Sequence, residues 1–400
     1  EDALSKVQKY LHRQGIDRLS PIARKVEREG TPNRRNVVLV FMESMSANLM
    51  GTFGSDKKLT PYLDSLYQQS LSFSHFYSSG IHTNHGIYST LYSFPAIMKR
   101  NAMKGSVIPV YSGLPTVLQE NGYCNLFFMT HESQYDNMNA FLRTNGFDEI
   151  YAQENYPSEK VVNSFGVQDD FMYQYALPIL NERAGTGNPF FSVLLSISNH
   201  PPYVIPPYFH PHSDVLEEQI VEYADWSIRQ FMQAAEKQPW FDNTIFVFLG
   251  DHGKMVGTPE CEMPQSYNHI PLMIYGKDIK PGVYDGFGGQ VDVSPTLLGL
   301  LNISYLQNNF GVNLLEEERP CMFFTADNLI GARDSVNMFI YSPDSQQEFK
   351  YKLEEGKLHA ATGTDEEAFR NLKDYCFSML QSTESLVKEH KTLDKVSVKK

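Results

Sequence analysis

Short, nearly continuous apolar runs recur along most of the chain. The first covers residues 36–42, and four others have the same character: residues 124–129, 189–197, 244–249 and 271–275. Runs of this length that are rich in branched and aromatic residues are typical of strands that are buried on both faces of a parallel sheet. The pattern therefore predicts that these segments are strands of one central sheet.

Helical patterns separate the predicted strands. They cover residues 61–69, 114–121, 217–237 and 293–301. The first begins with Pro61 after Thr60, and Gly122 follows the second, which are common signals for the start and the end of a helix. Strands that alternate with helices predict an α/β fold with a mostly parallel sheet, in which ligands bind beyond the carboxyl ends of the strands.

The pattern changes at both ends of the chain. Residues 1–35 are charged and predict a helical lead-in segment on the outside of the main domain, residues 36–305. Residues 306–400 predict a small C-terminal α+β subdomain and a tail, with a helix over residues 365–390. The short strands expected there are residues 320–325, 336–341 and 349–353. The lysine-rich end, residues 388–400, predicts a frayed or solvated terminus.

Composition narrows the function classes. The 400 residues include 34 basic and 47 acidic side chains, which gives a net charge of −13, and 42% are hydrophobic. This composition is typical of a globular protein. Its negative balance argues against general nucleic-acid binding, which requires a cationic face. An anionic substrate remains compatible with it, because a bound metal ion reverses the local charge.

Membrane and cysteine patterns give two further expectations. No apolar run reaches the roughly 18–20 residues that a membrane helix needs. The chain begins with Glu1 rather than Met, so we expect a piece of a longer protein whose anchor or export signal lies upstream. The four cysteines are widely spaced, which favours buried thiols, with one disulfide as the alternative. They are Cys124, Cys261, Cys321 and Cys376.

Polar residues directly follow two of the predicted strands. Glu43 follows the first, and Asp251 and His252 follow the fourth within a Gly-Asp-His-Gly sequence. Carboxylate oxygen and imidazole nitrogen are suitable ligands for Zn²⁺ or Mn²⁺. Taken alone, Glu43 could equally cap a turn, and the Asp-His pair could form a turn with a satisfied histidine. Together they predict a metal site at the carboxyl edge of the sheet.

A hydroxyl group lies at the start of another predicted helix. Residues 83–94 form this helix, with Thr83 near its N-terminus, where backbone N–H groups favour anions. A hydroxyl bound there to a divalent cation would lose its proton more readily and act as a nucleophile. The alternative is a simple helix cap. His82 and His85 flank Thr83 and are candidates to line the same pocket.

Two more histidines lie beside predicted strands. His200 follows the third strand and precedes two prolines. An imidazole there could bind a phosphoryl group or donate a proton to a leaving group, or it could be an ordinary loop residue. His269 precedes the fifth strand and is a candidate substrate contact or a support for one.

The motifs together resemble the alkaline-phosphatase-like hydrolases. The resemblance rests on residues 36–44, 60–66, 250–253, 269–276 and 290–298 and extends from about residue 36 to residue 302. Within that superfamily the chain looks most like the lipoteichoic acid synthase branch, the phosphoglycerol transferases, which are often grouped with sulfatases. The combination of motifs is specific, although each motif alone is not.

The resemblance implies a fold and a set of site residues. The implied fold is a three-layer α/β/α sandwich with a mostly parallel central sheet. Glu43, Thr83, Asp251 and His252 would hold one divalent ion, Mn²⁺ in the first place and Zn²⁺ or Mg²⁺ otherwise. Thr83 would also be the nucleophile, and His200 would match the histidine that contacts substrate in this family.

The chain departs from its relatives at two places. Sulfatases carry a Cys or Ser in a Cys/Ser-x-Pro-x-Arg motif, which is absent here and disfavours sulfate-ester hydrolysis. Phosphoglycerol transferases carry a Trp and an Arg where this chain has Asp136 and Met138. A cation for the substrate phosphate must then come from elsewhere, with Arg143, Arg100 and His131 as candidates.

We therefore expect a metal-dependent phosphoryl-group transferase that acts on phospholipid head groups or cell-envelope glycans through a covalent phosphothreonine. The alternatives are a phosphoethanolamine transferase, a phosphodiesterase or phosphatase, a sulfatase-like hydrolase, or an inactive envelope-binding protein. The resemblance implies a membrane-anchored protein with its catalytic domain on the extracytoplasmic side. We also expect a monomer that binds no nucleic acid.

Overall fold

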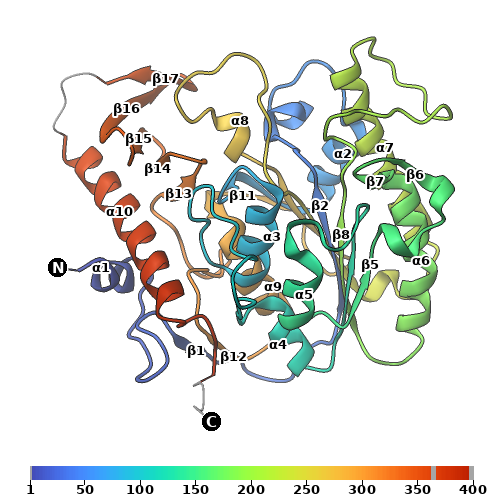
Figure 1. Cartoon of the computed structure of the whole chain (residues 1–400), viewed down its shortest axis with the longest axis horizontal. Coiled ribbons are helices and arrows are strands. Elements are labelled where there is room, and N and C mark those ends of the chain that lie inside the picture. Colours follow the sequence, from blue (N-terminus) through green and yellow to red (C-terminus); the bar gives the residue numbers. More distant parts are fainter. Residues whose placement is uncertain (1, 362–365, 396–400) are drawn as a thin grey trace.

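An eight-stranded sheet forms the centre of the protein (Figure 1). The structure is a computed structural model and describes residues 2–361 and 366–395. From one edge of the sheet to the other, the strands are β11 (Gly282–Gly289), β3 (Leu71–Tyr77), β10 (Leu272–Tyr275), β9 (Thr244–Gly250), β2 (Asn36–Met42), β8 (Phe190–Leu195), β4 (Cys124–Phe128) and β5 (Glu149–Tyr151).

The middle of this sheet is parallel, as the apolar runs predict. Strand β2 pairs in parallel with β8 on one side and with β9 on the other, and β4 continues the parallel order beyond β8. Every residue of β2, β8 and β9 is buried. The prediction of a parallel strand at residues 271–275 is wrong, because β10 pairs antiparallel with both of its neighbours. The chain leaves β9 at the carboxyl edge and returns along it without a crossover helix, which requires the antiparallel direction.

Helices cover both faces of the sheet. Residues 38, 40 and 42 of β2 pack in a hydrophobic cluster with α2 (Pro61–Gln69), α6 (Asp169–Ala184) and α7 (Leu216–Ala235). Residues 37, 39 and 41 pack in a second cluster on the other face. The helices of that second face are α3 (Thr83–Tyr92), α4 (Leu114–Glu120), α5 (Met138–Thr144) and α9 (Val293–Leu300).

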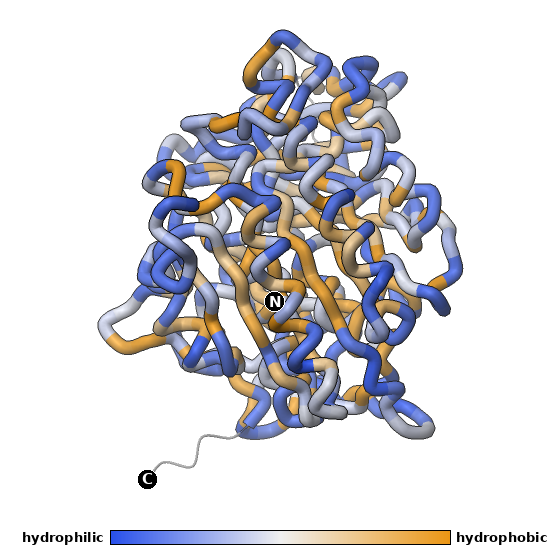
Figure 2. Tube along the Cα trace, turned by 90° about the vertical axis from the view of Figure 1, so that its right-hand side faces the viewer, coloured by the Kyte–Doolittle hydropathy of each residue, from blue (hydrophilic) through white to orange (hydrophobic). Residues whose placement is uncertain are grey.

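This arrangement is the predicted three-layer α/β/α sandwich. Figure 2 shows hydrophobic residues concentrated in the middle of the molecule and mostly hydrophilic residues along its outline. The alternation of side chains along β2 divides the core between the two helical layers.

The C-terminal part forms a second, antiparallel sheet. Its five strands are β13 (Met322–Thr325), β14 (Ile330–Arg333), β15 (Asn337–Ser342), β16 (Gln347–Glu354) and β17 (Lys357–Ala360), in that spatial order. Helix α10 (Glu367–Lys388) packs along this sheet and matches the predicted helix at residues 365–390. The predicted α+β character is confirmed, although β14 and β17 were not among the expected strands. The boundaries at residues 35 and 305 stay predictions.

The two ends of the chain are tied into the fold. The lead-in contains the helix α1 (Ala3–Tyr10), and it also contains an unexpected strand, β1 (Arg24–Val26), which pairs with β12 (Tyr305–Gln307). Figure 1 shows α1 beside α10. Near the other end, the Thr392 hydroxyl donates to the Val110 carbonyl and the Asp394 carboxylate accepts from the Ser112 hydroxyl. Residues 392 and 394 are therefore held in place rather than frayed, residues 388–390 are exposed as a solvated terminus would be, and residues 396–400 lie outside the described part.

The disulfide alternative is also wrong, because all four cysteines are free. Cys321 and Cys376 are buried, and the other two are partly exposed. None of the helices in the described ranges combines the length and apolar character that crossing a membrane requires.

Candidate active site and metal centre

The loops that follow three neighbouring strands lie together at the carboxyl edge of the central sheet. Strands β8, β2 and β9 are adjacent, and their carboxyl ends lead into residues 196–203, 43–46 and 251–254. The loops after β2 and β9 are joined directly: the Ser44 amide donates to the Asp251 carboxylate at 2.9 Å, and the Asp251 amide donates to the Met42 carbonyl. Ser44 has a φ of 52°, a costly conformation for a non-glycine residue that these contacts hold in place.

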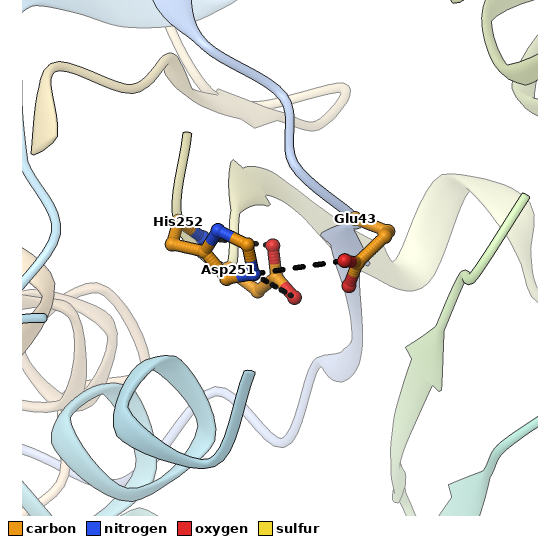
Figure 3. Close-up of side chains that lie close together, drawn as sticks. All are labelled: Glu43, Asp251 and His252. Carbon is orange, nitrogen blue, oxygen red and sulfur yellow. Dashed lines mark hydrogen bonds and ion pairs between the residues drawn. The ribbon is translucent and has the colours of Figure 1, made fainter. Parts of the chain in front are cut away.

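The predicted ligands from these loops lie together. Glu43, Asp251 and His252 each offer a ligand atom, and the three atoms lie within 4.8 Å of one another. The His252 Nε2 atom is 3.6 Å from a Glu43 oxygen and 3.6 Å from an Asp251 oxygen (Figure 3). Both carboxylates are buried, with 1% and 0% of their residue surfaces exposed. The residues that follow β2 and β9 thus bring two carboxylates and one imidazole together.

Thr83 joins the same cluster from the other side. It is the first residue of α3, and its Oγ1 lies 3.0 Å from Glu43 Oε2 and 2.8 Å from Asp251 Oδ2. A hydroxyl has one proton and can donate only one of these two hydrogen bonds. The other contact therefore needs a proton on a carboxylate or a cation between the oxygens. The structure brings together all four residues that the sequence analysis proposed as ligands.

Close packing of α3 against β9 makes this approach possible. Gly86 lies one turn after Thr83, and a Cβ atom there would be 2.2 Å from the Asp251 carbonyl oxygen. Any larger residue would push the start of α3 away from the carboxylates. A glycine three residues after a candidate nucleophile was a signal for this contact in the sequence.

The electrostatics show why the cluster suits a cation. Burial and the neighbouring Glu43 charge raise the pKa of Asp251 well above its usual range. Burial opposes the charged forms of the other two residues, but His252 lowers the pKa of Glu43 to about 2, and the two carboxylates raise the pKa of His252 to about 10. Both shifts favour the protonated forms of Asp251 and His252 in the protein without metal. Two carboxylates, an imidazole and a hydroxyl fit a divalent metal ion, which would replace those protons.

Two predicted histidines lie near this cluster. The His200 side chain is half-buried, its Nδ1 is 2.6 Å from the Pro201 carbonyl oxygen, and its ring centre is 4.3 Å from that of Phe165. The His200 charge contributes to the low pKa of Glu43. His131 is buried, and burial lowers its pKa while the Glu43 charge opposes this shift. The imidazoles of His200 and His131 therefore both interact electrostatically with the Glu43 carboxylate.

The histidines around Thr83 have different surroundings. His82 is exposed, and its Nε2 lies 2.6 Å from a carboxylate oxygen of Asp327, in the turn between β13 and β14. His85 is buried, which lowers its pKa to about 4, and its Nε2 is 3.0 Å from the Arg100 carbonyl oxygen. The C-terminal sheet thus contributes the Asp327 carboxylate to the surroundings of His82, the residue before Thr83.

Two other candidates have their contacts elsewhere. The His269 Nε2 atom lies 2.8 Å from the Ser74 carbonyl oxygen, and the ring stacks on Tyr77. Burial lowers its pKa to about 4, which is consistent with a neutral packing residue. Arg143 is exposed on α5 and donates to Asn139 one turn earlier. No hydrogen bond or ion pair within the described ranges joins either residue to the carboxylate cluster.

Lys254 was not among the site residues predicted from the sequence. This residue follows the Gly-Asp-His-Gly sequence directly, and its Nζ atom donates to Asn199 Oδ1 at 2.6 Å. The ammonium also lies 5.4 Å from the centre of the Tyr203 ring. Burial lowers the pKa of Lys254 to about 8. A lysine immediately after a metal-ligand motif was the signal that could have identified it.

Comparison with known proteins identifies the family of the chain. The family model described as Sulfatase matches residues 35–303. The chain belongs to the sulfatase family. The lipoteichoic acid synthase-like protein YvgJ of Bacillus subtilis is 25% identical over 72% of this chain and 51% of its own length. The lipoteichoic acid synthase of Staphylococcus aureus (strain USA300) is 24% identical over 86% of this chain and 56% of its own length. The chain thus spans about half the length of these curated relatives.

Solved structures confirm the predicted fold. A protein of the alkaline phosphatase superfamily from Vibrio parahaemolyticus has a TM-score of 0.88 and 25% identity, covering 98% of this chain and 96% of its own. The lipoteichoic acid synthase LtaP of Listeria monocytogenes has a TM-score of 0.77 and 22% identity, covering 96% of this chain and 98% of its own. Family membership places the chain among the hydrolases and transferases of this superfamily.

Proposed function

We propose that this protein is a metal-dependent phosphoryl-group transferase whose substrate is a phosphate ester of a phospholipid head group or a cell-envelope glycan. The observation that carries this proposal is the Thr83 hydroxyl, which lies within 3.0 Å of two buried carboxylates at the start of a helix. The relatives named lipoteichoic acid synthases support the substrate class.

Glu43, Thr83, Asp251 and His252 would hold the divalent ion, for which Mn²⁺ is our first choice. When bound, the ion supplies Lewis-acid stabilisation of negative charge and favours the deprotonated Thr83 hydroxyl. The N-terminus of α3 adds backbone N–H groups and a helix dipole, which favour the negative phosphoryl oxygens. This placement directs the Thr83 oxygen and the positive end of the helix toward the same space.

The reaction then proceeds in two displacements. The Thr83 oxygen attacks phosphorus, a bond forms between them, and the bond from phosphorus to the first alcohol breaks. His200 donates a proton to the leaving oxygen. In the second displacement, another alcohol loses its proton to His200 and attacks the phosphothreonine, which releases Thr83. Because Nδ1 of His200 faces the Pro201 carbonyl, Nε2 is the atom available for this exchange.

Water in place of the second alcohol would make the protein a phosphodiesterase or phosphatase. Sulfate transfer is disfavoured because position 83 is Thr rather than a residue that matures to formylglycine. We place the domain on the extracytoplasmic side of a membrane, where envelope substrates occur.

A head-group release assay tests this proposal. The purified protein with Mn²⁺ is incubated with vesicles of phosphatidylglycerol or phosphatidylethanolamine, and diacylglycerol release is measured. We expect release from phosphatidylglycerol and a modified Thr83 in peptide mass spectra of the stopped reaction. Release from phosphatidylethanolamine alone would identify the phosphoethanolamine transferase. Protein that binds no metal and releases neither product would support the envelope-binding alternative.

A further inference from the structure

Lys254 is held firmly beside the proposed metal site. The Ser46 hydroxyl accepts from the Lys254 amide at 2.8 Å and donates to the Lys254 carbonyl at 3.1 Å. Ser46 belongs to the loop that begins with Glu43, so the backbone of Lys254 is tied to the metal-ligand loop. The lysine side chain therefore begins from a fixed point at the carboxyl edge of β9.

The side chain reaches across to the loop after β8. Its ammonium donates to Asn199 Oδ1 at 2.6 Å and faces the Tyr203 ring. Asn199 is 1% exposed, and its amide nitrogen donates to the Ser44 carbonyl at 3.2 Å. These contacts link the three loops after β8, β2 and β9. The ammonium thus contacts Asn199, the residue before His200, and Asn199 in turn bonds to Ser44, the residue after Glu43.

The charges of Glu217 and Glu43 act on the Lys254 ammonium, but neither carboxylate forms an ion pair with it in the part of the chain that the structure describes. An ammonium group has three N–H donors, and Asn199 accepts only one hydrogen bond from it. No ion pair involves this nitrogen in residues 2–361 and 366–395, whereas exposed lysines such as Lys277 do form ion pairs. Lys254 is half-buried, and the two N–H donors that Asn199 does not occupy are available to the oxygen atoms of a ligand. The site therefore suits an anion.

We propose that Lys254 binds a non-bridging oxygen of the phosphate ester that Thr83 attacks. The inference rests on the proposed function and specifies its substrate contact. It supplies a cation for the substrate phosphate at the carboxyl edge of the sheet, where the loops after β8, β2 and β9 meet. Asn199 and Tyr203 act as positioning residues that hold the ammonium toward the phosphate.

The first test compares Lys254→Met and Lys254→Arg, with Lys277→Met as the matched control for a surface lysine. Inorganic phosphate binding to the metal-loaded proteins is measured by calorimetry, and metal content by elemental analysis. We expect Lys254→Met to lose about 10- to 100-fold in phosphate affinity, as for a hydrogen bond to a charged group. Lys254→Arg, which keeps the charge, should bind more tightly than Lys254→Met, and the control should match the wild type. Unchanged phosphate affinity in folded, metal-loaded Lys254→Met would overturn the proposal.

The second test uses the unaltered protein and does not depend on how the variants fold. Inorganic phosphate should protect Lys254, but not Lys277, from an amine-reactive reagent, as measured by peptide mass spectrometry. Equal labelling of Lys254 with and without phosphate would overturn the proposal. Both readouts are binding measurements, so they stand apart from the head-group release assay. Protection of Lys254 without turnover would support the anion site and contradict the proposed reaction. Turnover without protection of Lys254 would support the reaction and contradict the anion site.

Discussion

Two clusters of buried charges in this protein are balanced in opposite ways. Asp292 and Arg319 form a two-point ion pair, with nitrogen–oxygen distances of 2.6 and 2.8 Å. The carboxylate also accepts from the Gly289 and Val312 amides, and the guanidinium donates to the Phe310 carbonyl. At the carboxyl edge of the sheet, Glu43 and Asp251 share a single imidazole, and the Thr83 hydroxyl cannot donate to both of them.

The difference separates a structural pair from a ligand site. In the Asp292–Arg319 pair, the protein itself satisfies both charges, so nothing further needs to bind. In the Glu43–Asp251 cluster, the chain supplies an excess of acid that is stable only with added protons or a cation. Burial alone did not separate these cases, because all four residues are buried. The two cases differ in whether the protein itself supplies the opposite charge.

The largest effect that we expect comes from Thr83→Ala. Removing the proposed nucleophile should reduce turnover by about four to six orders of magnitude. The free energy of unfolding should change by only about 1 kcal/mol, because a single hydroxyl is lost. Turnover and thermal unfolding are measured on the same preparation, with Thr83→Ser as the variant that keeps a hydroxyl. Turnover by Thr83→Ala at the wild-type rate would contradict the assignment of Thr83.

Arg319→Met should show the reverse pattern. It leaves Asp292 buried without its cation, and we expect a loss of about 3–5 kcal/mol in the free energy of unfolding. Denaturant unfolding measures this loss, and Lys277→Met on the surface should change stability by less than about 1 kcal/mol. Metal binding by the protein that remains folded should be unchanged. A stable Arg319→Met variant that no longer binds metal would contradict the assignment of the Asp292–Arg319 pair as structural and of the Glu43–Asp251 cluster as the metal site.

Metal binding at the Glu43–Asp251 cluster should raise the free energy of unfolding. This gain should not depend on the Asp292–Arg319 pair. With free Mn²⁺ at about 100 times its dissociation constant, the gain in unfolding free energy should be about 2.7 kcal/mol. Melting curves with Mn²⁺ and with a chelator measure this gain, and Zn²⁺ and Mg²⁺ can be compared in the same way. Asp251→Asn should lose the gain, because one ligand charge is removed. A full metal-dependent gain in Asp251→Asn would contradict the proposed ligand set.

The last expected effect is a dependence of stability on pH in the metal-free protein. The folded pKa of His252 is raised to about 10, so its contribution is present below the unfolded value of about 6.5 and is lost as pH rises toward 10. The raised pKa of Asp251 acts in the same direction from lower pH. Unfolding in chelator at several pH values should therefore show stability that falls between pH 6.5 and 10. A His252→Gln variant should have a shallower slope, and an equal slope would contradict the role of His252.

Much of the candidate site could be predicted because its residues follow strands directly. Apolar runs identify β2 and β9, and polar residues after parallel strands meet at one edge of the sheet, so Glu43, Asp251 and His252 were found together. Thr83 was found because the start of α3 has a helix signature. Motifs that are short and local carry this kind of information.

Other features depend on distant contacts and were missed. Lys254 stands out only when its nitrogen is seen beside Asn199, with no ion pair to a carboxylate among the described residues. His269 looked like a site residue, but it packs on Tyr77 and bonds to Ser74. The antiparallel direction of β10 depends on how the chain returns from the site, which its own apolar pattern does not encode.

By itself, the sequence determined the α/β class and the central parallel strands, which follow from periodicity, a local property of the chain. Residue types at strand and helix ends indicated candidate ligands, and the resemblance to a known family implied the set of four. Only the tertiary structure decided which buried charges are neutralised, because the partners of a buried charge can lie far away in sequence. Arg319 pairs with Asp292 from 27 positions away, whereas Asp251 meets Glu43 and Thr83 across more than half of the main domain.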